Sequence, residues 1–231
     1  SNIYFRKKKF KRSLHLLEKM KIQIDLYQGQ NKENFMKEFI TLTALNENFL
    51  GNHIKASTLI DDYLDSLKPN PESVYNLLLV RSMIHIQQGE LKNATRILSY
   101  LNFSDNWIKK NIGFEWLLNK KFMEILLHME LENIEMVDSR IKSLTRSYKG
   151  YLIKNIDFQI LPFLKLLQDY FKEPKILHSN KFQSAIMRTL KFKKQEDEDI
   201  FTISFYSWLK AKITKQPLYE TTLELVSNSF E

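Results

Sequence analysis

The sequence predicts an all-α fold of about eleven helices that pack as antiparallel pairs. Gly51 is followed five residues later by Ala56, and Gly89 is followed five residues later by Ala94. Each Gly can end one helix, and each Ala allows the next helix to pack closely. The chain has only 5 Gly and 5 Pro, fewer than a β-sandwich or an α/β domain of 231 residues would need for its turns. Hydrophobic residues make up 43% and recur largely at helical spacing, which is enough to build a core.

Gly and Pro residues bound the helices expected in the first half of the chain. Gly29, Gly51 and Gly89 each follow an apolar-periodic segment, and Asn31 can cap the helix that begins after it. Pro69 and Pro71 separate the third helix from the fourth, since neither can continue a helix that precedes it. The expected helices are 3–28, 31–49, 54–67, 71–88 and 91–101.

The second half has weaker boundaries. Ser104 or Asp105 can cap a long helix, Gly150 is expected to break the chain, and Pro162 to kink or interrupt the helix that contains it. The apolar run Ile200–Tyr206 suits a strand by composition, but its helical flanks favour a helix. The expected helices are 104–131, 133–148, 151–171, 180–192, 199–213 and one from 216 onward, with a charged connector at 193–198.

Composition limits the kinds of site that the chain can hold. The formal net charge is +8, but Lys, Asn, Ile and Phe are abundant together, as in any protein of an AT-rich genome, so the charge alone does not indicate an anion site. Without Cys, the chain has no disulfide and no thiolate ligand or nucleophile. The sequence shows neither an apolar run long enough for a membrane span nor a signal peptide, and we expect a cytoplasmic protein. It lacks an initiator Met, so we expect a fragment of a longer chain.

The repeated pattern resembles a degenerate tetratricopeptide (TPR) array. Between Tyr75 and Phe103 the matching residues are Ser82, Gly89-Glu90, Leu91, Ala94 and Leu98; the preceding unit contributes Ala44, Gly51, Ala56 and Pro69, and a following unit Glu132-Asn133-Ile134 and Val137. Tyr4, Phe5, Lys9, Phe10, Ser13 and Leu17 fit the end of a first helix and the start of a second. The spacing of 38 and then 43 residues exceeds the 34 of the family. Residues 74–172 are also similar to uncharacterised bacterial helical-repeat proteins.

The resemblance implies a right-handed superhelical stack of helix pairs, an α-solenoid, spanning residues 1–231 as one domain. Recognisable repeats cover 1–149, and 150–231 is expected to form irregular C-terminal helices. TPR proteins bind peptides in a groove formed by the first helices of the pairs. The corresponding positions hold Thr41, Leu45 and Asn48 in one unit and Asn76, Leu79 and Met83 in the next. The expected contacts with a partner are Leu45, Phe49, Leu79 and Met83. The family's Lys–Asn clamp for a peptide carboxylate is absent, so an amphipathic helix or an apolar peptide suits the groove better. Alternatively, a helix of the same chain fills it.

The N-terminal region carries the sharpest charge feature of the sequence. Its basic residues are Arg6, Lys7, Lys8, Lys9, Lys11 and Arg12, which we call the basic cluster. Tyr4, Phe5 and Phe10 are interleaved with them. Such a mixture can hold a nucleic-acid backbone and stack bases, or attract an acidic partner. In the alternative, the aromatic side chains pack inward and the cations surround a solvated helix end.

Patterns expected of an enzyme are missing from the sequence. The five histidines, His15, His53, His85, His128 and His178, lack the spacing of a helical metal site. The acidic run Glu196–Asp199 is expected on a solvated connector, and no phosphate loop or dinucleotide motif occurs. We therefore expect a non-enzymatic scaffold that binds a protein or peptide, without cofactor or metal. A nucleic-acid-associated or regulatory module is the main alternative, and a helical enzyme with a site between helices is a weaker one.

Overall fold

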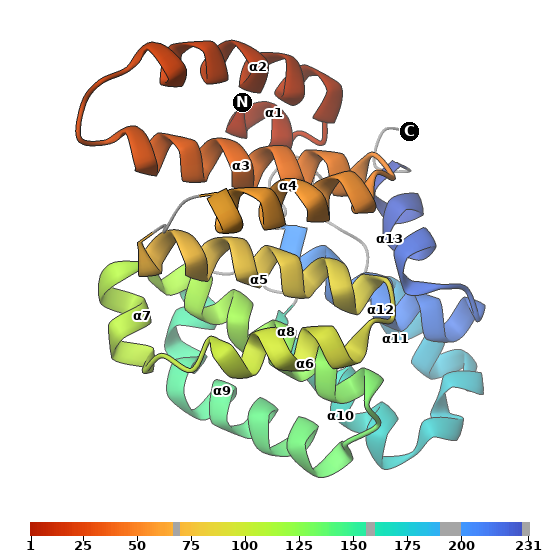
Figure 1. The fold of residues 1–231 in the computed structure, drawn as a ribbon. Coiled ribbons are helices and arrows are strands. Elements are labelled where there is room, and N and C mark those ends of the chain that lie inside the picture. The colour runs from red at the N-terminus through yellow and green to blue at the C-terminus, as the bar shows by residue number, and fades with distance from the viewer. Residues whose placement is uncertain (67–69, 156–159, 190–199, 228–231) are drawn as a thin grey trace. The chain divides into compact units, whose positions relative to one another are not determined.

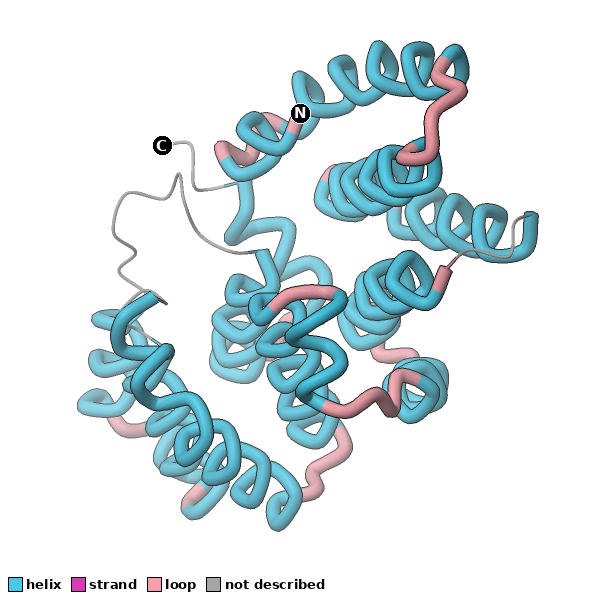
Figure 2. Tube along the Cα trace, turned by 90° about the vertical axis from the view of Figure 1, so that its left-hand side faces the viewer, coloured by secondary structure: helices cyan, strands magenta, loops and turns pink. Residues whose placement is uncertain are grey.

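The structure is a computed structural model that describes residues 1–66, 70–155, 160–189 and 200–227. Within these ranges every regular element is a helix and no strand occurs, so the predicted all-α class is confirmed (Figures 1 and 2). The described ranges contain thirteen α-helices and one 3-10 helix, more than the eleven expected. The chain divides into two compact units. Unit 1 comprises Ser1–Met123 with Gln195–Glu231, and unit 2 comprises Glu124–Lys194.

The helices of the first half follow the predicted order closely. They are α1 (Asn2–Arg6), α2 (Phe10–Leu26), α3 (Lys32–Phe49), α4 (His53–Ser66), α5 (Pro71–Gln87), α6 (Leu91–Tyr100) and α7 (Asp105–Asn111). Those of the second half are α8 (Phe114–Glu130), α9 (Ile134–Asn155), α10 (Ile160–Lys172), the 3-10 helix η1 (Pro174–His178), α11 (Asn180–Thr189), α12 (Ile200–Thr214) and α13 (Leu218–Ser227). The apolar run that begins at Ile200 is therefore helical, as predicted.

Two antiparallel helix pairs form the centre of unit 1. Helices α3 and α4 pack together across Gly51, and α5 and α6 across Gly89, as the Gly-to-Ala pattern predicted (Figure 1). Both glycines have positive φ, +92° at Gly51 and +74° at Gly89, a conformation that Gly adopts without steric cost. Ala56 and Ala94 are each 0% exposed. The helices α3 and α5 also contact each other, so the first helices of successive pairs lie side by side.

Helix α5 is the most deeply buried helix of these pairs. Its N-terminus is fixed by Asn70, whose side-chain oxygen accepts a hydrogen bond from the Ser73 amide at 2.8 Å, and by Pro71 in the first turn. Buried residues lie on all sides of the helix, because α3, α4, α6 and α13 all pack against it.

The C-terminal helices of unit 1 complete its core. Helix α13 packs against α12, α3 and α5. The Tyr219 hydroxyl donates a hydrogen bond to the Asn48 carbonyl at 2.6 Å, and burial raises the pKa of Tyr219 to about 12. The Asn48 amide in turn donates to the Gln87 side chain at 2.9 Å, and the Gln87 amide lies 3.4 Å from the Ser204 hydroxyl of α12. Polar contacts therefore join residues that are far apart in the sequence.

Unit 2 has an apolar core that includes Val137, Phe163 and Ile186, and polar contacts also join its successive helices. Arg140 on α9 donates a hydrogen bond to the Glu124 carboxylate at 2.6 Å, and Gln168 on α10 donates to Asp138 on α9 at 3.1 Å. Pro162 lies in the first turn of α10, where its missing N–H breaks no helical hydrogen bond. A kink or short break near Pro162 was expected from the sequence; α9 ends at Asn155 and α10 begins at Ile160, and residues 156–159 lie outside the described residues.

Three predicted boundaries differ from the structure. The helix expected over 3–28 is interrupted at Lys7–Lys9, where Lys8 has a φ of +54°, and the helix expected over 104–131 is interrupted at Gly113, with a φ of +120°. The predicted break at Gly150 is wrong, because Gly150 lies inside α9. An exposed Gly costs a helix only about 1 kcal/mol, which the other residues of α9 can offset.

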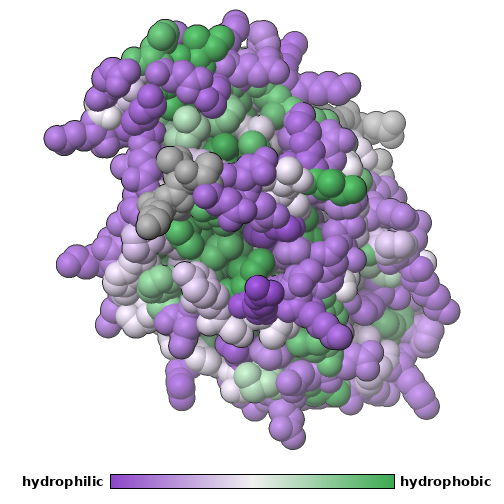
Figure 3. Space-filling model, viewed as in Figure 1, coloured by the Kyte–Doolittle hydropathy of each residue, from purple (hydrophilic) through white to green (hydrophobic). Residues whose placement is uncertain are grey.

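The outer face of α2 carries exposed apolar side chains. The buried face carries Phe10, Leu17 and Ile24, whereas Ile22 and Leu26 are 59% and 70% exposed. Ile22 is turned away from Leu17 by helical geometry, since five residues at 100° each place it on the opposite side. Figure 3 shows hydrophobic surface above α2 at the top of the view.

Candidate interaction site

The four side chains predicted to line a partner groove are buried. Leu45 and Phe49 on α3 are each 5% exposed, and Leu79 and Met83 on α5 are 0% exposed. Helices α3 and α5 pack against each other, and α13 packs against both. These four residues therefore belong to the core of unit 1 and form no exposed groove. The physical reason is that the chain's own helices cover these side chains, which was the alternative to an open groove.

The basic cluster surrounds the turn between α1 and α2. Arg6 ends α1, Lys7 to Lys9 form the turn, and Lys11 and Arg12 lie in the first turn of α2. The turn is closed by the Lys8 amide, which donates to the Phe5 carbonyl, and by the Lys9 amide, which donates to the Tyr4 carbonyl, both at 2.8 Å. Lys8 is buried, and the other five members are exposed. The cluster is thus not one uniform patch.

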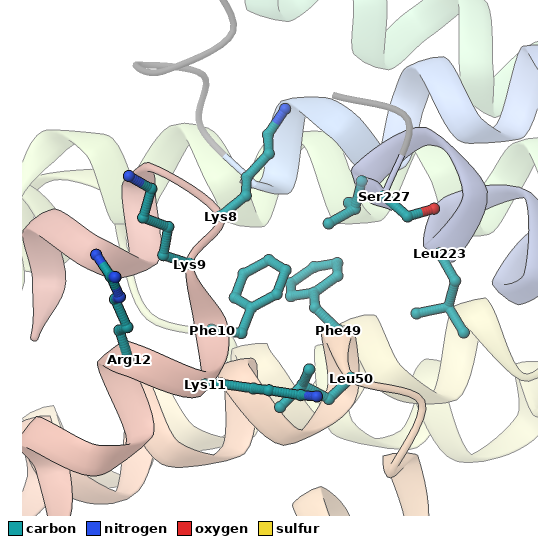
Figure 4. Close-up of a pocket in the computed structure, with 10 residues that line it drawn as sticks. Lys8, Lys9, Phe10, Lys11, Arg12, Phe49, Leu50, Leu223 and Ser227 are labelled. Carbon is teal, nitrogen blue, oxygen red and sulfur yellow. The ribbon is translucent and has the colours of Figure 1, made fainter. Parts of the chain in front are cut away.

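A pocket of about 540 Å³ opens beside this turn (Figure 4). Its lining comes from the α1–α2 turn and the start of α2, from the C-terminal end of α3, and from α13. The lining residues are Lys8, Lys9, Phe10, Lys11, Arg12, Phe49, Leu50, Leu223, Val226 and Ser227. Four of the six predicted basic residues and one of the four predicted groove residues, Phe49, thus meet in one cavity.

Stacked aromatic rings connect the turn to α3 at the pocket. The ring centroids of Phe10 and Phe49 lie 5.8 Å apart at an interplanar angle of 19°, and Phe5 lies 5.8 Å from Phe10 on the other side. All three side chains are buried. Aromatic pairs at such distances add about 0.5–1.5 kcal/mol each beyond the burial of their surface. The rings therefore fix the position of the basic turn against α3.

The pocket has a positive side. Lys9, Lys11 and Arg12 are exposed, and the described part of the chain shows no ion pair for any of them. The α2 N-terminus has no acidic residue in its first turn, and the Lys9 side chain makes no capping hydrogen bond. The first backbone N–H groups of a helix have no partner within it, so this end carries partial positive charge. Charge from both sources favours an anionic group here.

Sequence reasoning missed the wall of the pocket on α13. Leu223, Val226 and Ser227 follow the basic turn by more than 200 residues and carry no local motif. They reach it because α13 docks against the C-terminal end of α3, where the Leu223 side chain approaches Gly51. The only available signal was the apolar periodicity of the last helix, which predicts a buried face but not its neighbour.

Burial shifts the pKa values of two histidines outside the pocket. The Nδ1 atom of His85 lies 2.5 Å from the Glu90 carboxylate across the Gly89 turn, and burial lowers the pKa of His85. Burial likewise lowers the pKa of His128 in unit 2. Among the described residues no three His, Asp or Glu side chains gather as metal ligands. The acidic run 196–199 lies outside the described residues.

In the described ranges, none of the helices combines the length and apolar character required to cross a bilayer.

Comparison of the chain with protein-family models, with curated proteins and with solved structures finds no match. The pocket, its charge and its walls are therefore the observations on which a function can be argued.

Proposed function

We propose that the protein is a non-enzymatic interaction scaffold that binds a segment of a partner protein in the pocket between the α1–α2 turn and α13. The observation that supports this is an apolar cavity of about 540 Å³ with exposed cations along one side. Apolar side chains of a partner would fill the cavity, and polar groups at its rim would fix the orientation. The described lining includes no carboxylate or imidazole that would act as a general acid or base.

The scaffold would be a right-handed superhelical stack of TPR-like helix pairs, as the resemblance of the sequence implies, and would act in the cytoplasm. Two packing features support the repeat assignment. The first helices of successive pairs, α3 and α5, contact each other, and the small residues Ala44, Ala56, Ser82 and Ala94 are all 0% exposed. In helical repeats such positions allow close approach of neighbouring helices.

The test is selection of binding peptides from a displayed random library on the full chain. We expect selected peptides to lose binding to a Leu223→Gln variant, because Leu223 lines the pocket and is only half-buried. Ile54→Gln is the matched control, since Ile54 is 72% exposed on α4. Both variants must keep the helical circular-dichroism signal of the parent. Failure to select any peptide, or selection of peptides that ignore Leu223→Gln, would refute the proposed function.

The second candidate is a nucleic-acid-associated module that uses the basic cluster. It is favoured by the exposure of Lys9, Lys11 and Arg12. It is opposed by the burial of Phe5 and Phe10, which leaves those rings unable to stack on bases. Binding to random oligonucleotides at several salt concentrations separates the candidates, because phosphate-driven binding weakens steeply as salt rises.

A further inference from the structure

We propose that the partner segment is acidic beside its apolar anchor, with carboxylates over Lys9, Lys11 and Arg12 and apolar side chains against α13. This inference rests on the proposed function and specifies the partner's chemistry. It follows from the unequal distribution of charge around the pocket, from the unpartnered start of α2, and from the size of the cavity.

The charge of the pocket lies mainly on the side away from α13, and the Lys11 side chain extends below the rings of Phe10 and Phe49 toward Leu50. All of its charged residues lie between positions 8 and 12. Figure 4 shows Lys9 and Arg12 on one side, Leu223 on the other, and the facing rings of Phe10 and Phe49 between them. A ligand that matches both sides must itself be amphipathic, with its negative groups toward the α1–α2 turn.

The acidic residue on α13 that stands next to the pocket wall does not neutralise these cations. Glu224 instead forms an ion pair with Lys210 of α12 at 2.9 Å. Within the described residues no carboxylate pairs with Lys9, Lys11 or Arg12. The positive end of the α2 dipole adds to their field, and α2 is a full helix of 17 residues. An external carboxylate is the group that this arrangement attracts.

The volume of the pocket suits side chains better than a whole helix. It lies in the lower part of the range of roughly 300–1,000 Å³ that is typical of pockets for small ligands. One or two large apolar side chains of a peptide would enter, while the rest of the peptide would lie along the rim. Exposed cations at a rim mainly set the orientation and association rate of a charged partner.

The experiment uses three labelled synthetic peptides of equal length and the full chain. The first peptide carries Phe and Leu anchors with flanking Glu, the second has the same anchors with flanking Lys, and the third keeps Glu but replaces the anchors by Ala. Fluorescence anisotropy should give the first peptide a dissociation constant about tenfold lower than that of the other two. Raising the salt concentration should narrow the difference in dissociation constant between the Glu-flanked and the Lys-flanked peptides, but not the difference caused by loss of the apolar anchors.

Charge reversal on the protein tests whether Lys9, Lys11 and Arg12 produce the preference for the Glu-flanked peptide. The triple variant K9E/K11E/R12E should weaken binding of the first peptide about tenfold. The triple variant K92E/R96E/K110E is the control, because its residues are exposed on α6 and α7 and it changes the formal net charge of +8 by the same amount. It should leave the dissociation constant unchanged. Circular dichroism and melting temperature show whether each variant remains folded.

Several outcomes would overturn the inference. If the Lys-flanked peptide binds equally well and Leu223→Gln abolishes its binding, the partner is not acidic, while the proposed function stands. If no synthetic peptide binds and the displayed library also yields none, both the acidic partner and the proposed scaffold function are refuted. If dodecanoate binds in the pocket and none of the three peptides displaces it, the occupant is a small anionic amphiphile. If oligothymidylate competes with the first peptide for the three cations and binds more tightly, the site recognises nucleic acid.

Discussion

At the residue scale, close helix packing explains why the sequence repeats a small residue five positions after a Gly. Ala56 and Ala94 are 0% exposed, each in the helix that follows a Gly turn. The repeated Gly-to-Ala spacing therefore identified real packing positions. Where a pattern repeats, its small residues can be assigned from the sequence alone, because only a close helix–helix contact requires them.

Replacing Ala94 by Leu should lower the free energy of unfolding by about 1–3 kcal/mol, because the larger side chain overpacks a filled contact. The measurement is thermal or urea unfolding followed by circular dichroism. Ser99→Leu provides the control, since Ser99 is exposed on the same helix. An Ala94→Leu variant as stable as the parent would contradict the assignment of this contact.

His85 gives the protein a defined response to acid. Burial, and secondarily the charge of Arg81, holds the pKa of His85 below its ordinary value of 6.5, although Glu90 acts in the opposite direction. The unfolded chain therefore binds this proton more readily than the folded chain, and stability is lost as pH falls below about 6.5. Glu90 has a pKa lowered from 4.5 and affects stability at lower pH.

The melting temperature should consequently be lower at pH 5.5 than at pH 7.5, and the difference should shrink in a His85→Gln variant. The Gln side chain keeps an N–H that donates to Glu90 but does not titrate. His128→Gln removes the half-buried histidine of unit 2, whose pKa is lowered in the same direction, and shows how much of the difference in melting temperature it contributes. An undiminished difference in His85→Gln would exclude His85 as its source.

At the scale of the element, the sequence predicted helices well where Gly and Pro bound them and poorly elsewhere. Gly51, Gly89 and Pro71 stand at observed boundaries, whereas Gly113 was overlooked and Gly150 was wrongly assigned a break. Gly51, Gly89 and Gly113, which lie between consecutive helices, all have positive φ. Sequence alone does not show which Gly adopts that conformation. The turn at Lys8 carried no Gly at all.

The docking of α13 can be tested at Tyr219. Tyr219→Phe removes the hydroxyl that donates to the Asn48 carbonyl, and should lower the free energy of unfolding by about 0.5–1.5 kcal/mol. The ring, which packs edge-on against His53 at 5.1 Å, is retained. Tyr100→Phe is the control, because Tyr100 is 68% exposed. Equal loss of stability in both variants would show that this hydrogen bond contributes nothing specific.

At the scale of the whole molecule, unit 1 is built from both ends of the chain. Its N-terminal part supplies the helix pairs, and its C-terminal part supplies α12 and α13. The sequence predicted the helices and left open whether the groove is covered by the chain's own C-terminal helices or by a partner, because docking of distant segments leaves no periodic signal in either one. The same closure explains why the predicted groove is covered and why the pocket joins α2 to α13.

A charge placed at Leu79 tests whether the chain's own helices cover the predicted groove. Leu79 is 0% exposed, so Leu79→Glu would bury a carboxylate without a partner and should lower the free energy of unfolding by more than about 3 kcal/mol. Ile54→Glu adds the same charge at an exposed position of α4 and should have little effect. If Leu79→Glu kept the melting temperature of the parent and lost only peptide binding, the predicted groove on α3 and α5 would be open after all.

Removing the C-terminal helices should destabilise unit 1 more than any single substitution. A chain that ends at Lys194 lacks α12 and α13. Their side chains Ile203, Trp208, Leu209 and Val226 are buried, so the surface that they cover on the remaining helices would meet water. We expect a lower melting temperature and stronger fluorescence of a dye that binds exposed apolar surface, compared with the full chain. The shortened chain would also lack Leu223 and Val226 from the pocket, so peptides selected on the full chain should no longer bind it. An unchanged melting temperature together with tighter peptide binding would mean that a partner displaces α12 and α13. The pocket beside α13 would then be rejected as the binding site.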